Sequence, residues 1–395
     1  MTSPIRALWL SENYYPNRGG MAHSCDRIVH ALREIGVTVD LVHFTRHVGA
    51  ITVERNAGGR YIAFPPGEDP AHGMNLLWTF FENDPHRAEL THVVAFGGLL
   101  PLLSGPVFAA WLGLPLVTLF RGNDFDAAIF SPKRSDIVHR AIEQARHVCV
   151  VTREKERKIR ALHPGAEPVW IPNGIDLESW TPSASDRRRA TEWRNNNVVP
   201  GKRTLGLFGQ IKLKKGGLFF LDALLRSGHA GRFHILFVGE LGEEVATWLE
   251  INGAEIDHTL LPFIDRFDLI PYYLASDMIV IPSFYDGMPN VLLEGAALAR
   301  PMLASTAGGM GDLLEDDRHG YLFPPGDVDR LVGAIARAAA ATDEELERLG
   351  GECRAAVAGL DHHTEAAAYR DLFTRSLPTH RIPSNGSGSI IEQRS

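Results

Sequence analysis

The sequence predicts an α/β protein made of two doubly wound domains, each with a parallel sheet. Its 395 residues suffice for two domains of ordinary size. A hydrophobic fraction of 45% and a charged fraction of 22% are typical of globular proteins and exclude disordered and fibrous classes. Short apolar segments alternate with helical patterns in two series, which a polar segment at 181–203 separates. Such alternation is typical of parallel sheets covered by helices.

The first series starts with a strand at 6–10, a helix at 21–35 and a strand at 37–44, and it continues with strands at 147–151 and 168–171. Residues 93–120 between them contain no charged residue, and this run is longer than the ~20 residues of a membrane span. Prolines and glycines divide it into VVAF, PLLSGPVFAAWLG and LPLVTLF. We therefore predict a buried strand, helix and strand rather than a membrane span.

The second series contains strands at 204–208, 233–239, 259–263 and 278–282. The polar segment at 181–203 suits either a linker or an exposed first helix. The predicted domains are therefore residues 1–180 and 204–364, with 181–203 as the linker region. We expect residues 365–378 to form a terminal helix that packs back on the first domain. The Gly/Ser-rich residues 379–395 are expected to be a disordered tail.

The charge and cysteine content excludes some functions. The net charge of −8 argues against nucleic acid as the main partner, since a duplex binder needs a concentrated basic surface. Cys25, Cys149 and Cys353 have no second Cys or His at metal-ligand spacing, so we interpret them as reduced thiols. Because the start of the chain has no signal-peptide pattern, a cytoplasmic location is expected.

Two glycine-containing turns follow predicted first strands. Asn17-Arg18-Gly19-Gly20 precedes the first helix, where backbone N–H groups and the helix dipole favour an anion, although ordinary turn chemistry would also explain it. In the second half, Lys212, Lys214 and Lys215 lie within four positions, just before Gly216-Gly217. Clustered cations beside backbone donors suit a diphosphate, and the alternative is a solvated charge run.

The most informative segment contains two carboxylates eight residues apart. Asp286 is followed by Gly287-Met288-Pro289-Asn290, which open a helix containing Glu294. One acid in the loop and one about a turn into the helix can hold different hydroxyls of a ligand whose phosphates bind the first N–H groups. The pair could also act as general acid and base. A capping acid and an unrelated surface Glu remain the alternative.

These motifs give the chain a resemblance to a known family. YDGMPNVLLE resembles the acid-x7-acid signature of retaining glycosyltransferases of family 4, which have the GT-B fold. PYYLASDMIVIPS, STAGG and HGYLFPPGD resemble the segments around that signature, and YYPNRGGMAHSCDRIVHALREIGVTVDLV and IPNGIDLESWTP resemble the family's first domain. The resemblance covers nearly the whole chain, in the expected order.

The resemblance implies transfer of a sugar from a nucleotide-sugar donor to a small-molecule or glycan acceptor with retention at the anomeric carbon. It implies no cofactor and no metal, and it is compatible with peripheral membrane contact. A UDP sugar is the donor that we favour. Lys215 would neutralise the diphosphate, Glu294 would bind the ribose, and Asp286 would hold the sugar and support the reacting carbon. The remaining donor-binding residues that it implies are Gly19, Gly20, Gln210, Phe263, Ile264, Gly287, Met288, Pro289, Asn290 and Val291.

The sequence departs from the family pattern at the proposed reaction centre. Asp286 stands where Glu is usual, Gln210 where a diphosphate-binding Arg is expected, and Arg121 where a His is expected. We assign Arg121 to the catalytic centre beside Asp286, and Arg121, Asn123 and Asp124 to acceptor binding. Our hypothesis is that Arg121 replaces the Arg missing at 210 and contacts the donor phosphates. The rival hypothesis is that it binds an anionic acceptor.

Two other functions are compatible with these motifs. The chain could bind a nucleotide sugar without turnover, or it could be a GT-B nucleotide-sugar epimerase. Product analysis separates them, because a binding protein leaves the donor intact and an epimerase forms a new nucleotide sugar without an acceptor. The sequence identifies neither the acceptor nor the sugar.

Overall fold

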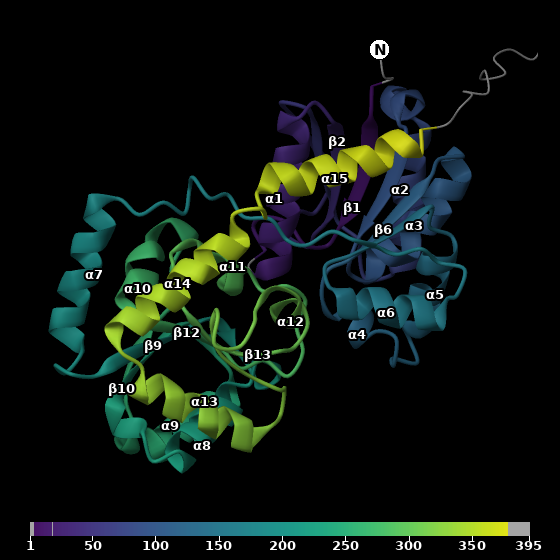
Figure 1. The fold of residues 1–395 in the computed structure, drawn as a ribbon. Coiled ribbons are helices and arrows are strands. Elements are labelled where there is room, and N and C mark those ends of the chain that lie inside the picture. Colours follow the sequence, from purple (N-terminus) through teal and green to yellow (C-terminus); the bar gives the residue numbers. More distant parts are fainter. Residues whose placement is uncertain (1–3, 18, 378–395) are drawn as a thin grey trace, which may run out of the picture.

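The computed structural model describes residues 4–17 and 19–377, which form two sheets covered by helices (Figure 1). The first sheet has eight strands in the order β3-β4-β2-β1-β5-β6-β7-β8, and the second has six in the order β11-β10-β9-β12-β13-β14. All neighbouring strands are parallel except β3 and β4. The predicted α/β class with two parallel-sheet domains is confirmed.

The first domain contains β1 to β8 and six α-helices. Its strands are β1 (Arg6–Ser11), β2 (Thr38–Phe44), β3 (Thr52–Asn56), β4 (Gly59–Phe64), β5 (His92–Phe96), β6 (Leu116–Phe120), β7 (His147–Val150) and β8 (Val169–Trp170). Its helices are α1 (Gly20–Glu34), α2 (Pro70–Glu82), α3 (Leu99–Leu112), α4 (Asn123–Asp126), α5 (Ser135–Glu143) and α6 (Arg153–Leu162), with the 3₁₀ helix η1 (Pro85–Glu89).

Both faces of this sheet are buried. In β1, Leu8 and Leu10 belong to the core beneath α2, α3 and α5, while Ala7 and Trp9 belong to the core beneath α1. The uncharged run 93–120 forms β5, α3 and β6, as predicted. No helix in the described part of the chain has both the length and the apolar character needed to cross a membrane.

The second domain has the same plan with fewer strands. Its strands are β9 (Arg203–Ile211), β10 (Phe233–Leu241), β11 (Asp257–Leu261), β12 (Met278–Ile281), β13 (Met302–Ser305) and β14 (Gly320–Phe323). Its helices are α7 (Ala184–Asn197), α8 (Gly217–Arg226), α9 (Glu243–Asn252), α10 (Ile270–Ala275), α11 (Asn290–Ala297), α12 (Gly309–Leu313), α13 (Val328–Ala340) and α14 (Asp343–Val357). Short 3₁₀ helices are η2 (Leu213–Lys215), η3 (Ala230–Arg232), η4 (Gly253–Glu255) and η5 (Arg266–Asp268).

Of the two interpretations of residues 181–203, the structure shows the helix. Ser183 and Asp186 form a reciprocal capping box at the start of α7. The helix packs on α10, and Arg194 Nη1 lies 2.9 Å from Asp277 Oδ2. The segment thus belongs to the second domain, not to a free linker.

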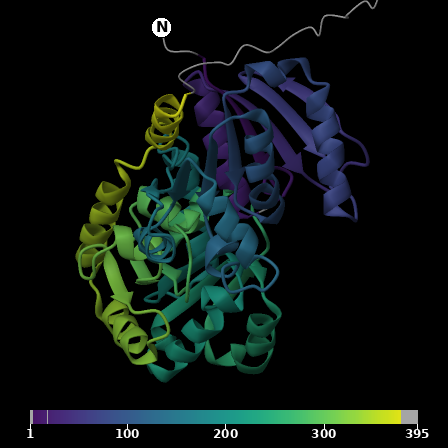
Figure 2. The same ribbon diagram turned by 90° about the vertical axis from the view of Figure 1, so that its right-hand side faces the viewer.

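The last described helix, α15 (His362–Arg375), returns to the first domain and packs along α1 (Figures 1 and 2). Ala366, Tyr369 and Phe373 of α15 share a buried core with Trp9 and Ile28. The chain therefore crosses between the domains twice, before α7 and before α15. The expected tail at 379–395 lies outside the described residues.

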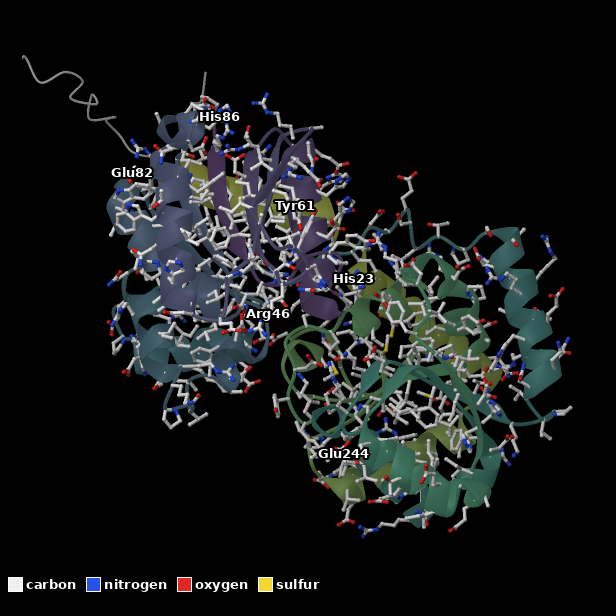
Figure 3. The ribbon with its side chains drawn as sticks, turned by 180° about the vertical axis from the view of Figure 1, so that it is seen from behind. His23, Arg46, Tyr61, Glu82, His86 and Glu244 are labelled. Atoms are coloured by element: carbon white, nitrogen blue, oxygen red, sulfur yellow. The ribbon has the colours of Figure 1, made fainter. Side chains whose placement is uncertain are left out.

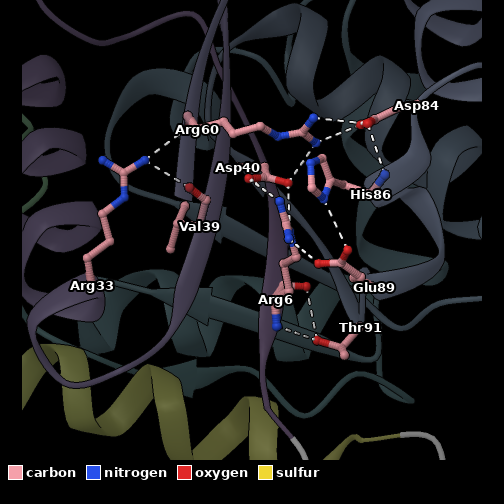
Figure 4. Close-up of polar contacts among 9 residues, drawn as sticks. All are labelled: Arg6, Arg33, Val39, Asp40, Arg60, Asp84, His86, Glu89 and Thr91. Carbon is pink, nitrogen blue, oxygen red and sulfur yellow. Dashed lines mark hydrogen bonds and ion pairs between the residues drawn. The ribbon is translucent and has the colours of Figure 1, made fainter. Parts of the chain in front are cut away.

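A charge cluster lies at the amino end of the first sheet (Figure 4). Arg60 Nη2 contacts Asp40 Oδ2 at 2.8 Å and Asp84 Oδ2 at 2.6 Å. Arg6 also binds Asp40, with Nε 2.9 Å from Oδ2, and it pairs with Glu89. We call these five residues the amino-end cluster. It lies at the edge opposite the carboxyl ends of the strands, where ligands bind in open parallel sheets.

Candidate active site between the two domains

A pocket of about 150 Å³ lies between the domains, lined by α1, by the segment after β8 and by the segment after β11. The first domain contributes α1, including His23, which lies where the domains meet in Figure 3, whereas His86 lies at the far end of that domain. The second domain contributes Phe263, Ile264 and Glu294. We call this cavity the interdomain pocket. It brings together the residues expected to contact the base and the ribose.

Glu294 is held in place from within the second domain. It lies in α11, and its Oε2 accepts a hydrogen bond of 2.6 Å from the hydroxyl of Tyr273. The ring of Tyr273 stacks on Phe208 at a centroid distance of 3.9 Å. Burial raises the pKa of Glu294. The carboxylate is therefore fixed at the pocket wall and has capacity to accept further hydrogen bonds from a ligand.

Lys215 and Asp286 are ion-paired in the structure. Lys215 ends η2, and Asp286 Oδ1 also accepts the N–H of Gly287 at 2.9 Å. Gly216 has a φ of 71°, and a Cβ there would lie 2.0 Å from the carbonyl oxygen of Pro282, so glycine is required. The two residues expected to contact diphosphate and sugar thus neutralise each other here.

The loop after Asp286 leads into the positive end of α11. Pro289 precedes the helix, Asn290 and Val291 form its first turn, and no side chain caps it within the described residues. Met288 is buried in the core beneath. An uncapped helix N-terminus beside a lysine is a favourable place for phosphate groups. A smaller cavity of about 40 Å³ joins Lys215, Pro289 and Val291 with Gln210.

Gln210 and the glycine turn of the first domain both lie near the start of α11, and each has its own contacts. Gln210 Nε2 donates to Glu240 Oε2 at 3.1 Å. Gly19 has a φ of 114°, which favours glycine, and directly precedes α1. Asn290 Nδ2 donates to the carbonyl of Gly20 at 3.4 Å across the domain boundary. The first-domain turn and the start of α11 are therefore neighbours, as the sequence interpretation required.

In the structure without ligand, Arg121 is engaged by buried partners. Arg121 is 5% exposed, and its side chain binds residues of the segment after β8 and of α15. Nη1 donates to the hydroxyl of Tyr369 at 2.7 Å, and Nη2 donates to Glu365 Oε1 at 2.9 Å and to Asn173. A contact with donor phosphates or with an acceptor would require the guanidinium to leave these partners. Both hypotheses for Arg121 therefore stay predictions.

The structure describes the side-chain contacts of Asp124, one of the two neighbours assigned to acceptor binding. Asp124 accepts the N–H groups of Arg121 at 2.9 Å and Gly122 at 2.6 Å. Burial raises the pKa of Asp124. Its carboxylate therefore fixes the loop after β6, and acceptor binding by it stays a prediction. Asn123 starts α4, and its side chain lies outside the described part of the structure.

Sequence reasoning missed the polar face of α1. His23, Asp26, Arg27 and His30 recur at helical spacing and line the interdomain pocket. Their spacing was available as a signal, but a polar helix face is normally assigned to solvent, and here it faces the other domain. Burial lowers the pKa of His23, and the charge of Arg266 across the pocket acts in the same direction. Tyr273 was also missed as the partner of Glu294.

One group of described side chains could bring three metal-ligand atoms within 4.8 Å of one another, namely Glu34, His362 and His363. Glu34 is the last residue of α1 and also lies 3.2 Å from His30. It is separated from Gly20 by the length of α1, which is roughly 20 Å for a helix of this size. The group is therefore remote from the Lys215–Asp286 pair.

Comparison with known proteins identifies the family. Residues 18–179 match the family model described as Glycosyltransferase Family 4, and residues 202–341 match the model described as Glycosyl transferases group 1. The chain belongs to glycosyltransferase family 4. The boundary between the matched segments falls at α7, where the structure passes from one domain to the other.

Curated relatives of this family 4 chain are distant. It is 25% identical over 219 residues to an Escherichia coli protein named UDP-Gal:alpha-D-GlcNAc-diphosphoundecaprenol alpha-1,3-galactosyltransferase, covering 53% of the chain and 54% of that protein. It is 26% identical over 336 residues to D-inositol 3-phosphate glycosyltransferase of Mycobacteroides abscessus, covering 76% and 71%. The match to the first relative thus spans only about half of that protein's length.

Solved structures match over a larger share of the chain. Sucrose-phosphate synthase from Thermosynechococcus elongatus superimposes with a TM-score of 0.78 at 19% identity, covering 94% of this chain and 100% of that one. The Anabaena protein HepE in complex with UDP and glucose superimposes with a TM-score of 0.72 at 19% identity, with the same coverage. At these identities the likeness shows the fold alone, and the fold is GT-B.

Proposed function

We propose that this chain is a retaining glycosyltransferase that moves a sugar from a nucleotide donor, preferably a UDP sugar, to an acceptor bound by the first domain. One observation carries the proposal. Glu294, the uncapped start of α11 and the Lys215–Asp286 pair follow one another along the wall between the domains. This order matches a nucleoside, a diphosphate and a sugar.

Donor binding requires an exchange of partners at Lys215. Without ligand, its ammonium neutralises Asp286. A diphosphate at the start of α11 offers Lys215 a more highly charged partner, and the exchange frees Asp286 for the sugar hydroxyls. The same carboxylate is then available to stabilise positive charge that develops at the anomeric carbon. The lysine thus serves as a counterion in both states.

The leaving nucleoside diphosphate is stabilised by residues of this chain. Lys215 and the dipole of α11 face the negative charge that develops on the β-phosphate, which is the role that a bound metal fills in other folds. Metal independence is part of the proposal. UDP is preferred because the name of the E. coli relative includes UDP-Gal and the Anabaena protein binds UDP. The three cysteines are free and buried, which suits a cytoplasmic location.

The test is a panel of nucleotide sugars, first without an acceptor. A thermal shift with UDP and UDP sugars, but not with other nucleotides, is expected. At a hundredfold excess over Kd the ligand adds about 2.7 kcal/mol to the free energy of unfolding. Candidate acceptors are then added, and the anomeric configuration of the product is determined by NMR. Binding with the donor always intact would indicate a binding protein, and a new nucleotide sugar without an acceptor would indicate an epimerase.

A further inference from the structure

A buried polar cluster joins the two chain crossings to the first domain. Glu365 of α15 accepts from Arg121 on Oε1 at 2.9 Å. Its Oε2 accepts from Arg27 Nη2 at 3.1 Å and from the N–H of Gly174 at 2.9 Å. We call Arg121, Asn173 and Glu365 the brace. One carboxylate thus binds α1, the loop after β6 and the segment leading to α7. Burial opposes ionisation of Glu365, but the two arginines keep its pKa below the usual range.

The brace extends into the second domain at the loop that follows Asp286. Asn173 Oδ1 accepts from Arg121, and its Nδ2 donates to the carbonyl of Met288 at 2.6 Å, with Asn173 buried. Gly287 packs on the carbonyl of Arg121, where a Cβ at 287 would lie 2.3 Å from that oxygen. Residue 121 therefore touches the loop of residues 286–290 directly through its backbone and indirectly through Asn173.

We propose that Glu365 and Arg121 are positioning residues that act through Asn173 on the loop of residues 286–290. This inference rests on the proposed function and deepens it. The guanidinium of Arg121 binds the amide oxygen of Asn173, which leaves the amide nitrogen facing Met288. Glu365 in turn fixes the guanidinium. The brace thereby sets where Asp286 stands relative to the first domain, where the acceptor binds.

The contacts predict a split between donor binding and turnover. Lys215 is positioned by η2 and Glu294 by Tyr273, both in the second domain and outside the loop of residues 286–290, so these two nucleotide contacts should persist when the brace is lost. What changes is the alignment of Asp286 with an acceptor on the other domain, and small misplacements of a reacting group lower the rate steeply. The kcat should therefore fall while the affinity for UDP is retained.

The experiment uses the full chain with Asn173→Ala, Glu365→Gln and the double variant. Asp371→Asn is the matched control, because it removes one carboxylate from an exposed position of the same helix. We expect kcat to fall about tenfold or more in each single variant, with the Kd for UDP within about twofold. The double variant should be no slower than the slower single variant, because both remove the same chain of contacts. Additive losses, or an equal loss of UDP affinity, would overturn the proposal.

A second measurement does not depend on transfer. Hydrogen exchange of the peptide covering 284–292 should become faster in Asn173→Ala and Glu365→Gln, and stay unchanged in Asp371→Asn. Asn173→Ala preserves the ion pairs of Glu365, so it remains informative if Glu365→Gln fails to fold. If the wild type shows no turnover, the proposed function fails. Hydrogen exchange of this peptide still tests whether the brace holds the loop of residues 286–290. Unchanged exchange in Asn173→Ala would refute it.

Discussion

Two charge clusters in the first domain contain a nearly fully buried arginine and differ in what they connect. Arg60 is 6% exposed and Arg121 is 5% exposed. The partners of Arg60 in the amino-end cluster all belong to the first domain. Arg121 instead binds Glu365, which is 244 positions away, and reaches the second domain through Asn173. Similar chemistry therefore stabilises one domain in the first case and sets the relation of two domains in the second.

The Lys215–Asp286 pair adds a contrast in exposure. Its side chains are 32% and 17% exposed, and within the described part of the chain Asp286 is the one carboxylate that forms an ion pair with the lysine. Water and a ligand can therefore compete for each partner, which is not so for Arg60 or Arg121. Buried and multiply bonded pairs suit a fixed geometry, whereas a partly exposed single pair suits an exchange of partners.

The largest expected effect comes from breaking the amino-end cluster. Arg60→Met leaves Asp40 and Asp84 buried without their shared cation, which should lower the free energy of unfolding by about 3–5 kcal/mol. Denaturant unfolding measures this loss. UDP affinity of the folded fraction should not change, because the cluster lies at the opposite edge of the sheet. Arg55→Met is the control, since Arg55 lies opposite Arg60 on β3 and is exposed. An equal loss of unfolding free energy in both variants would contradict the idea that the burial of Arg60 causes the effect.

Removing the ammonium group of Lys215 should weaken UDP binding and leave the free energy of unfolding nearly unchanged. Lys215→Ala is expected to weaken UDP by about 1.5–3 kcal/mol, the usual contribution of a charge-assisted contact. Glu294→Gln should weaken UDP in the same range. Calorimetry with UDP measures both, and Lys133→Ala serves as an exposed lysine control in the first domain. Unchanged affinity in both variants would exclude this assignment of the nucleotide site.

Much of the fold could be predicted from local sequence. The strands β1, β2, β7, β9, β10 and β12 overlap their predicted ranges because each is an apolar run between turn residues. The β3–β4 hairpin was not predicted, since every residue of β3 is exposed and its sequence TVERN lacks an apolar run. The helix α7 was only one of two alternatives, because it buries little more than Ala190.

The candidate site could be predicted only in part. Glu294, Phe263 and Ile264 meet at one pocket because a local motif and strand order place them there. The direction of Arg121 could not be predicted, because the loop after β6 borders both the cleft and α15, and its partners lie at 173, 365 and 369. Local sequence gives the position of a side chain along an element, whereas its partner depends on tertiary contacts.

Asp286→Asn tests whether the two residues of the Lys215–Asp286 pair have different roles, one in nucleotide binding and one in turnover. The change removes the partner of Lys215 in the free protein, so the lysine no longer has to leave a carboxylate when the diphosphate binds. UDP affinity should therefore stay equal or rise about twofold to fivefold, while kcat falls because the lost charge matters most in the transition state. Calorimetry and steady-state kinetics on the same preparation measure the two effects. A parallel loss of affinity and rate would indicate a structural role for Asp286.

A response to pH also distinguishes the two regions. Burial lowers the pKa of His92 to about 4, and the charge of the neighbouring His147 acts in the same direction. Its Nδ1 lies 2.9 Å from Thr91 Oγ1, and its Nε2 lies 3.2 Å from Ser376 Oγ, directly after α15. Because the folded pKa lies below the ordinary value of 6.5, stability from neutral His92 is full above that value. It is lost as the pH falls toward 4, by up to about 1.4 kcal/mol per pH unit.

The amino-end cluster should respond only at lower pH. The pKa of Asp84 is lowered by its hydrogen bond to Arg60, although burial opposes the shift, so its contribution persists down to its ordinary value of 3.8 and is lost below it. Between pH 7 and 5, hydrogen exchange should therefore accelerate in α15 and remain unchanged in α2, which ends just before Asp84. The strand β4 is a poor reference, because the hydroxyl of Tyr61 lies 2.9 Å from Nδ1 of His43, whose pKa burial also lowers to about 4. His92→Gln should abolish the pH dependence in α15, because the amide does not titrate. Equal acceleration in both regions would show that the acid response is global and does not begin where the last helix joins the first domain.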